Sequence, residues 1–199
     1  MRALIMAGGA GTRLGLGEKP LISLCNRPMI SYVIDAFCAC GCEVVVAVSP
    51  RTPMTRNWCR ANGIDHFCAA GANFILDMEE AVSGLDETRP LFVSVSDIPC
   101  INAELLFRIQ KEYLQSGMDA CSVWVPVDLV QFYRGGVTYR QTIHDTDACP
   151  AGVNILRGDR IGEQQEELQL VIPDLRLAIN VNTPADHDAA GRFLEQHSG

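Results

Sequence analysis

The sequence predicts an α/β fold in which a mostly parallel, twisted sheet carries helices on both of its faces. Short apolar runs rich in β-branched residues alternate with amphipathic segments of about 10 to 15 residues, which is typical of successive βαβ units. Capping residues and glycines separate these segments. We expect one strand to run antiparallel. The 199 residues are interpreted as a single domain, 1–199, with residues 127–149 as a small lobe or loop insertion.

Each element follows from its own pattern of apolar and capping residues. The buried, β-branched runs predict strands over residues 2–7, 43–49, 90–96, 119–127, 151–156 and 175–181. Helical periodicity with capping residues predicts helices over residues 28–41, 52–63, 73–84, 102–117 and 183–197. Residues 127–149 are polar and contain Gly135-Gly136, so they interrupt this alternation.

The composition excludes several classes of protein. Hydrophobic residues make up 48% and charged residues 20%, which indicates a compact globular chain. A formal net charge of −8 argues against a nucleic-acid-binding protein and against a polybasic protein of the membrane surface. Apolar runs stay well below the roughly 18 to 20 residues of a membrane-spanning helix. The first apolar run is also too short for a signal peptide, so we expect a cytoplasmic location with no membrane partner.

The nine cysteines are expected to be reduced thiols, because a cytoplasmic location keeps them so. Three of them, Cys38, Cys40 and Cys42, lie close enough in sequence to suggest a metal cluster. The chain nevertheless contains no C-x-x-C motif and no histidine pair at zinc spacing. The sequence therefore favours buried small apolar residues at these positions.

A glycine-rich loop, "MAGGAGTRLGLGEKP" at residues 6–20, follows the first predicted strand directly. Gly8, Gly9 and Gly11 let the backbone approach an anion and direct N–H groups toward it. Arg13 and Lys19 add positive charge where a polyphosphate would lie. A dinucleotide fingerprint is excluded because Leu14 stands where its last glycine is required, and a P-loop is excluded because Pro20 follows the lysine. An ordinary turn is the less favoured alternative.

Two further polar groups follow predicted strands. Asp97, in "SDIP", comes after the strand at 90–96, and a carboxylate there can hold Mg²⁺ beside phosphate oxygens; capping of a turn before Pro99 is the alternative. In "AINVNTPAD", Asn180 lies at the end of the predicted strand at 175–181 and Asn182 directly follows it. Either amide can supply an oxygen to a metal or hold a phosphate, and the same segment caps the last helix through Thr183.

These motifs resemble those of a known superfamily. "LIMAGGAGTRLGLGEKP" is similar to the signature of the nucleotidyltransferases that activate sugar and cofactor phosphates, and "SDIP" and "NVNTP" fall where that superfamily has its metal aspartate and late asparagine motif. Within it, the chain resembles the archaeal-type GTP:adenosylcobinamide-phosphate guanylyltransferases. That resemblance rests on "ALIMAGGAGTRLGLGEKPLISLCNRPMI", "VSPRTPMT", "PAGVNIL" and "INVNTPAD", which extend over nearly the whole chain. It implies a Rossmann-like nucleotidyltransferase fold.

The resemblance also implies a reaction and the residues that perform it. Adenosylcobinamide phosphate would attack the α-phosphorus of GTP with Mg²⁺ as the cofactor, and pyrophosphate would leave. The implied catalytic residues are Arg13, Lys19 and Asp97, and Asp97 and Asn182 would hold the metal. The implied acceptor-binding residues are Gly152, Asn154 and Asn180. The implied nucleotide-binding residues are Ala7, Gly8, Gly9, Gly11, Thr12, Arg13, Lys19, Ser49 and Gly71. The family often has a lysine where this chain has Ala10, so Arg13 and Lys19 are left to carry the triphosphate.

Other functions stay open at this point. A molybdenum-cofactor guanylyltransferase shares the loop, an aspartate motif and a similar asparagine motif. A sugar-1-phosphate nucleotidyltransferase usually has more chain for its acceptor pocket. A nucleotide-binding sensor without catalytic activity would keep the pocket and release no pyrophosphate. The sequence alone does not distinguish guanine from other bases, and it leaves a homodimer open.

Overall fold

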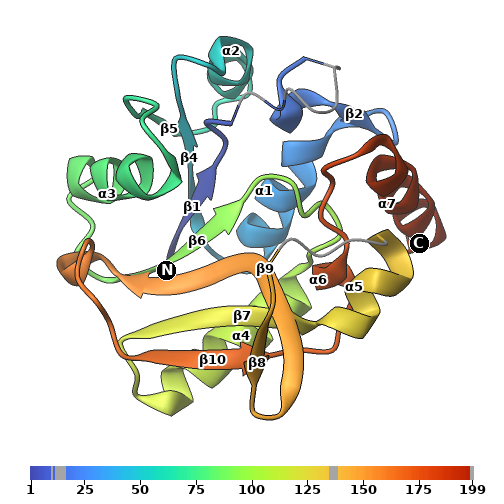
Figure 1. Cartoon of the computed structure of the whole chain (residues 1–199). Coiled ribbons are helices and arrows are strands. Elements are labelled where there is room, and N and C mark those ends of the chain that lie inside the picture. The colour runs from blue at the N-terminus through green and yellow to red at the C-terminus, as the bar shows by residue number, and fades with distance from the viewer. Residues whose placement is uncertain (10, 12–16, 135–138, 198–199) are drawn as a thin grey trace.

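The computed structural model describes residues 1–9, 11, 17–134 and 139–197 and is shown in Figure 1. Within these residues, eight strands form one sheet with the order β10-β7-β9-β6-β1-β4-β5, and β8 pairs with β9 outside that path. A separate two-stranded sheet joins β2 to β3. The strands are β1 (Arg2–Met6), β2 (Ser23–Leu24), β3 (Arg27–Pro28), β4 (Glu43–Val48), β5 (His66–Cys68), β6 (Pro90–Val95), β7 (Ala120–Pro126), β8 (Gln141–Ile143), β9 (Thr146–Arg157) and β10 (Glu167–Val171).

The helices alternate with these strands along most of the described chain. They are η1 (Lys19–Leu21), α1 (Met29–Ala39), α2 (Pro53–Ala61), α3 (Phe74–Gly84), α4 (Ala103–Ser116), α5 (Val127–Arg134), η2 (Gly158–Arg160), α6 (Leu175–Ala178) and α7 (Pro184–His197). Asn102 caps α4 as expected, since its side chain accepts a hydrogen bond of 3.1 Å from the backbone N–H of Leu105.

The sheet is mostly parallel, as the sequence predicts. Strand β1 lies between β4 and β6 and is parallel to both, and β5 and β10 are parallel to their neighbours β4 and β7. Strand β9 is the exception, because it runs antiparallel to β6, β7 and β8. The expected antiparallel strand is therefore confirmed, and in Figure 1 it appears as the long orange arrow beside β6 and β7.

Helices cover both faces of the sheet, and alternate residues of β1, one of its inner strands, point to opposite faces. Ile5 of β1 packs with Phe37 of α1 and Ile109 of α4 in the larger hydrophobic cluster. Leu4, the preceding residue, packs with Met78 of α3 on the other face. Leu4 and Ile5 are both fully buried. This arrangement confirms the α/β fold class and fixes the carboxyl ends of β1, β4 and β6 at one edge of the sheet.

Residues 127–149 are the segment predicted as a small lobe or loop insertion, and most of their described part has regular structure. They contain α5, β8 and the start of β9, and the β8–β9 hairpin extends the main sheet. Trp124 of β7 packs there with Ile143 and Ala148, which are both buried. A short hairpin needs only a few apolar side chains to bury one face, so its polar composition is compatible with this structure.

The predicted strand over residues 175–181 is wrong. Residues Leu175–Ala178 form the short helix α6, since the side chain of Asp174 accepts a hydrogen bond of 2.9 Å from the backbone N–H of Arg176 and caps its start. The alternating pattern of Leu175 and Leu177 suggests a strand, but four residues are too few to separate the two periodicities. Strands β2, β3, β5, β8 and β10 were not predicted, because they are short or only partly buried.

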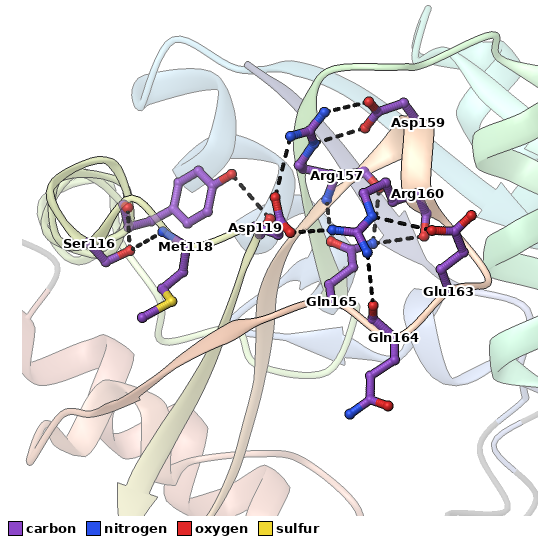
Figure 2. A network of polar contacts seen from close by, with 10 residues as sticks. Ser116, Met118, Asp119, Arg157, Asp159, Arg160, Glu163, Gln164 and Gln165 are labelled. Carbon is purple, nitrogen blue, oxygen red and sulfur yellow. Dashed lines mark hydrogen bonds and ion pairs between the residues drawn. The ribbon is translucent and has the colours of Figure 1, made fainter.

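A network of hydrogen bonds and ion pairs lies at the edge of the sheet where β6 and β7 begin (Figure 2). Asp119, just before β7, accepts hydrogen bonds from Arg160 and, at 3.3 Å, from Arg157 at the end of β9. Gln165 accepts a hydrogen bond of 2.9 Å from the backbone N–H of Arg157. These bonds hold the connection from β9 to β10 against β7, at the opposite edge from the site described below.

The cysteines partly follow the sequence prediction. Cys40 and Cys42 are buried, whereas Cys38 is exposed, so the expected burial is wrong for that residue. Burial raises the pKa of the Cys42 thiol to about 11, which keeps it neutral near pH 7. None of the helices in the described part of the chain combines the length and the apolar character that crossing a membrane requires.

Candidate active site

A cavity of about 360 Å³ opens at the carboxyl ends of β1 and β6. In open α/β sheets, ligands bind at this edge. The loop after β1 contributes Gly8, Gly9 and Gly11, and β6 with the loop after it contributes Val95, Ser96 and Asp97. Met6, Lys19, Arg51, Phe74, Asp77 and Asn182 complete the lining among the described residues.

Three of the predicted side chains meet in this cavity. The ammonium of Lys19 donates to Asp97 Oδ2 and, at 2.7 Å, to Asn182 Oδ1. Asn182 in turn donates from Nδ2 to Asn180 Oδ1 at 2.6 Å. The backbone N–H of Val181 donates to the carbonyl oxygen of Asp97 at 2.9 Å, which joins the two loops directly. Segments that lie far apart in sequence therefore form one polar centre.

The second carboxylate oxygen of Asp97 is available to a ligand. Oδ1 is buried and accepts no hydrogen bond from any residue that the structure describes. A buried oxygen without a partner is costly, and such atoms usually have a functional explanation. A carboxylate oxygen and the Asn182 amide oxygen are the hard ligands that Mg²⁺ prefers beside phosphate oxygens and water. The donor set of this centre thus fits the predicted metal.

The loop that carries Lys19 is anchored to α2 through Glu18. Its carboxylate accepts hydrogen bonds from the backbone N–H groups of Met54 at 2.7 Å and Thr55 at 2.6 Å, and from the Thr55 hydroxyl at 2.6 Å. Glu18 therefore caps α2 from a distance, with the negative charge that a helix N-terminus favours. Thr52, which directly precedes α2, does not cap the helix with its side chain, because its hydroxyl bonds with the backbone of Ser49.

A glycine is required at position 11 by the close approach of Lys19. Gly11 has a φ of +62°, and a Cβ atom there would lie 2.4 Å from Lys19 Cβ.

Asn182 is held in place by Asp186, which accepts hydrogen bonds from the backbone N–H groups of Asn182 at 2.9 Å and Thr183 at 2.8 Å. The Thr183 hydroxyl accepts from the backbone N–H of Asp186 at 3.2 Å, which confirms the predicted cap of α7.

Three residues of the predicted nucleotide-binding set, Ala7, Ser49 and Gly71, lie on the side of the loop after β1 that faces β4. The Ser49 hydroxyl donates to the carbonyl oxygen of Gly8 at 2.8 Å. Gly71 has a φ of +82°, and a Cβ atom there would lie 3.3 Å from Ser49 Cβ. Ala7 is buried below them and donates its backbone N–H to the carbonyl oxygen of Ala47 at 2.8 Å.

Of the three predicted acceptor-binding residues, one belongs to the polar centre and two do not line the cavity. Asn180 belongs to the polar centre through Asn182. Gly152 and Asn154 lie within β9, where Asn154 is paired with Val93 and Ser122, and neither residue lines the cavity. A Cβ atom on Gly152, whose φ is +82°, would lie 2.6 Å from a methyl carbon of Val95. The close approach that the glycine permits is therefore to β6, and its contact with an acceptor stays a prediction.

Some predicted residues of the site lie outside the described part of the chain, and some residues that line the cavity were not predicted. Thr12, Arg13 and Ala10 lie outside the described residues. Arg51 and Asp77 line the cavity but were not predicted. Arg51 follows β4, and its position just past a strand is the signal that could have found it. The sequence offered no such signal for Asp77, which lies within an amphipathic helix.

Cys100, three residues beyond Asp97, is not a nucleophile of this site. Its thiol is buried, and burial raises its pKa to about 12. A thiol with that pKa stays protonated near pH 7, and only the thiolate is reactive. Cys100 packs with Ile179 and Val181 in an apolar cluster behind the polar centre.

Comparisons with known proteins identify the family. Residues 3–151 match the model of the MobA-like NTP transferase domain. The chain is 28% identical over 207 residues to the adenosylcobinamide-phosphate guanylyltransferase of Methanocaldococcus jannaschii, and the match covers 98% of both chains.

Two solved structures share the fold. A hypothetical transferase from Thermus thermophilus has a TM-score of 0.72 and 17% identity, over 94% of this chain and 100% of its own. The molybdopterin-guanine dinucleotide biosynthesis protein A of Archaeoglobus fulgidus has a TM-score of 0.68 and 16% identity, over 98% of this chain and 100% of its own. The chain belongs to the MobA-like NTP transferase family and is a nucleotidyltransferase.

Proposed function

We propose that this nucleotidyltransferase transfers the GMP group of GTP to adenosylcobinamide phosphate, giving adenosylcobinamide-GDP and pyrophosphate. The observation that carries the proposal is the meeting of Lys19, Asp97 and Asn182 beside a glycine-rich loop, in a chain similar along its whole length to a guanylyltransferase of that name. The proposal places the protein in cobalamin biosynthesis.

In the proposed reaction, a phosphate oxygen of the acceptor attacks the α-phosphorus of GTP. The bond from that phosphorus to the oxygen that bridges to the β-phosphorus breaks, and pyrophosphate leaves with the electron pair. The attacking phosphate is ionised near pH 7, so the protein need not remove a proton from it. Its task is to position two anions and to neutralise their charge.

The chain's own groups divide this task. The backbone N–H groups around Gly8, Gly9 and Gly11 are proposed to bind the triphosphate, with the nucleoside toward Ser49 and Gly71. Lys19 is proposed to contact the α-phosphate, where charge rearranges in the transition state. Arg13, which lies outside the described residues, is proposed to bind the departing β- and γ-phosphates.

Asp97 is proposed to hold Mg²⁺, because its Oδ1 is buried beside the cavity with no partner among the described residues. Asn182 is proposed to add its amide oxygen. The metal, when bound, supplies positive charge that neutralises the phosphates. Asn180 orients Asn182 through their hydrogen bond of 2.6 Å.

The proposal is tested by supplying the purified protein with GTP, Mg²⁺ and one acceptor at a time, while pyrophosphate release is measured. We expect turnover with adenosylcobinamide phosphate and none with molybdopterin or a sugar 1-phosphate. Asp97→Asn should lower that turnover by about 100-fold or more. Asp35→Asn is the matched control, because Asp35 is an exposed carboxylate of α1 that pairs with Arg27 away from the cavity. Turnover with another acceptor alone would refute the proposed substrate.

A further inference from the structure

The cavity contains a second carboxylate, Asp77, that the proposed transfer reaction does not use. Asp77 lies in the first turn of α3 and is only 5% exposed. It nevertheless lines the cavity, and a Cβ atom built on Gly8 would lie 3.6 Å from Asp77 Oδ2. A carboxylate this buried requires hydrogen-bonding partners, and its surroundings show which of its oxygens has them.

One oxygen of Asp77 is fully used by the protein. Oδ1 accepts hydrogen bonds from the backbone N–H groups of Gly71 at 2.9 Å and Ala72 at 2.8 Å. These two bonds fold the loop between β5 and α3 over the carboxylate and fix its orientation. Both of these hydrogen bonds end on Oδ1, and Oδ2 is the oxygen nearer to Gly8. The carboxylate therefore presents one free acceptor to the cavity.

The position of Asp77 separates it from the phosphate-binding centre. Strand β1 lies between β6 and β4 in the sheet, and β5 lies beyond β4. Asp97 follows β6, whereas α3 follows β5, so the two carboxylates approach the cavity from opposite sides of the loop after β1. If phosphates lie near Lys19 and Asp97, the base of the same nucleotide extends toward Asp77 and Ser49.

The chemistry of the bases makes this free oxygen selective. Guanine carries two donors side by side, N1–H and the N2 amine, and a carboxylate oxygen accepts from that edge. Adenine presents the lone pair of N1 at the equivalent position, which a carboxylate repels. Hypoxanthine keeps N1–H but lacks the amine, and xanthine has an acceptor oxygen in place of the amine.

We propose that Asp77 is the residue that selects guanine, with Oδ2 accepting hydrogen bonds from the N1–H and N2–H edge of the base. This inference rests on the proposed use of a nucleoside triphosphate at this cavity, but not on the identity of the acceptor. Its role is specificity and not catalysis, because the base lies away from the reacting phosphorus.

The test is calorimetric binding of GTP, ITP, XTP and ATP, each with Mg²⁺, to the full-length protein and to two variants. Asp77→Asn keeps an oxygen for the N–H groups of Gly71 and Ala72 and turns an amide donor toward the base. The matched control is Glu80→Gln, since Glu80 lies on the same helix and accepts a hydrogen bond of 2.8 Å from the backbone N–H of Ala70, but does not line the cavity.

We expect the unmodified protein and Glu80→Gln to bind GTP at least 10-fold more tightly than ITP or ATP. Asp77→Asn should lose about 10- to 100-fold in affinity for GTP and less for ITP, because both bases lose the contact at N1–H but only guanine also loses the contact to its amine. Its affinity for XTP should rise, since an amide donor matches the extra oxygen of xanthine.

Several outcomes would overturn the inference. An unchanged order of the four nucleotides in Asp77→Asn would do so, and so would an equal loss for all four, which indicates a structural role. Nucleotide selection that follows Asp77 in a protein that does not use adenosylcobinamide phosphate would support the inference and refute the proposed acceptor. Transfer of GMP to that acceptor, with unaltered nucleotide selection in Asp77→Asn, would support the proposed acceptor and refute the role of Asp77.

Discussion

Lys19 and Asp97, 78 residues apart in sequence, form an ion pair that joins the loop after β1 to the loop after β6. Both side chains are largely buried, with 16% and 14% of their surface exposed. The same ammonium also contacts Asn182, so a single positive charge links three segments of the chain. Any change at Lys19 therefore affects the phosphate site, the proposed metal ligand and the asparagine together.

Replacement of Lys19 by alanine should affect turnover more than nucleotide binding. We expect kcat to fall by about 100-fold, because a charge aimed at the reacting phosphate is worth most in the transition state. Kd for GTP should weaken by less than about 10-fold, since the glycine loop and Arg13 remain. Steady-state kinetics and calorimetry measure the two effects. Lys111→Ala, at an exposed position of α4, is the control, and an effect confined to KM would argue against this role.

Replacement of Glu18 by alanine should destabilise the protein by about 1 to 2 kcal/mol, since α2 loses the carboxylate that caps it. The loop before Lys19 loses its three hydrogen bonds to Met54 and Thr55 at the same time. Urea denaturation measures the free energy of unfolding. Glu195→Ala, at an exposed position of α7, should leave it unchanged. Equal stability of the two variants would show that the Glu18 contacts contribute little.

Two glycine substitutions separate steric contact from backbone strain. Gly152 and Gly117 both have positive φ, of +82° and +69°. A Cβ atom at Gly152 would meet Val95 at 2.6 Å, whereas at Gly117 no heavy atom lies within 4 Å. Gly117→Ala should cost about 1 to 2 kcal/mol from the backbone alone. Gly152→Ala should cost more, about 3 kcal/mol or above, by urea denaturation. Equal losses would mean that β6 and β9 shift to relieve the contact.

The pair of Asp174 and Arg176 predicts a dependence of stability on pH. Hydrogen bonds from the Arg176 guanidinium, of 2.9 and 2.6 Å, hold the pKa of Asp174 below its ordinary 3.8. Because the folded state binds this proton less tightly than the unfolded state, the charged carboxylate stabilises the fold above about pH 4. That contribution is lost as the pH falls through the lowered pKa.

Asp174→Asn removes the charge and keeps an oxygen that can cap α6. The variant should be less stable than the unmodified protein by about 0.5 to 1 kcal/mol at pH 7, since the ion pair lies partly exposed. The difference should shrink as the pH falls below about 4. Chemical denaturation of both proteins at pH 7, 5 and 3 measures it. A difference in stability that stays constant from pH 7 to pH 3 would show that the charge of Asp174 is not its cause.

The sequence predicted the centre of the fold better than its edges, for a physical reason. Strands β1, β4 and β6 are buried on both faces, so their β-branched runs have one interpretation. Residues Glu167–Val171 of β10 are only partly buried, and their side chains carry little periodic signal. The short segment Leu175–Ala178 satisfies both periodicities, and only the cap at Asp174 decides between them.

The same contrast applies to the site. Lys19 and Asp97 were predicted to lie together because each follows a strand of the same sheet, and Asn182 because of its motif. Asp77 was missed, since an acidic residue in an amphipathic helix is normally interpreted as solvent-facing. Its burial depends on the path of the loop at Gly71 and Ala72, which bonds back onto it. The local sequence pattern around Asp77 does not predict that the loop at Gly71 and Ala72 folds back and donates hydrogen bonds to its carboxylate.

The antiparallel strand β9 has a consequence for the way the chain is made. β6 gains one of its two neighbours, and β7 gains a partner, only when residues up to 157 have left the ribosome. Asn182 completes the polar centre later still, 163 residues after Lys19. A nascent chain that stops before β9 leaves one edge of β6 and both edges of β7 unpaired, because β10 also follows β9 in sequence. Unpaired strand edges are templates for aggregation. Synthesis of the chain from residue 146 onward thus determines both when the sheet is complete and when the site first exists.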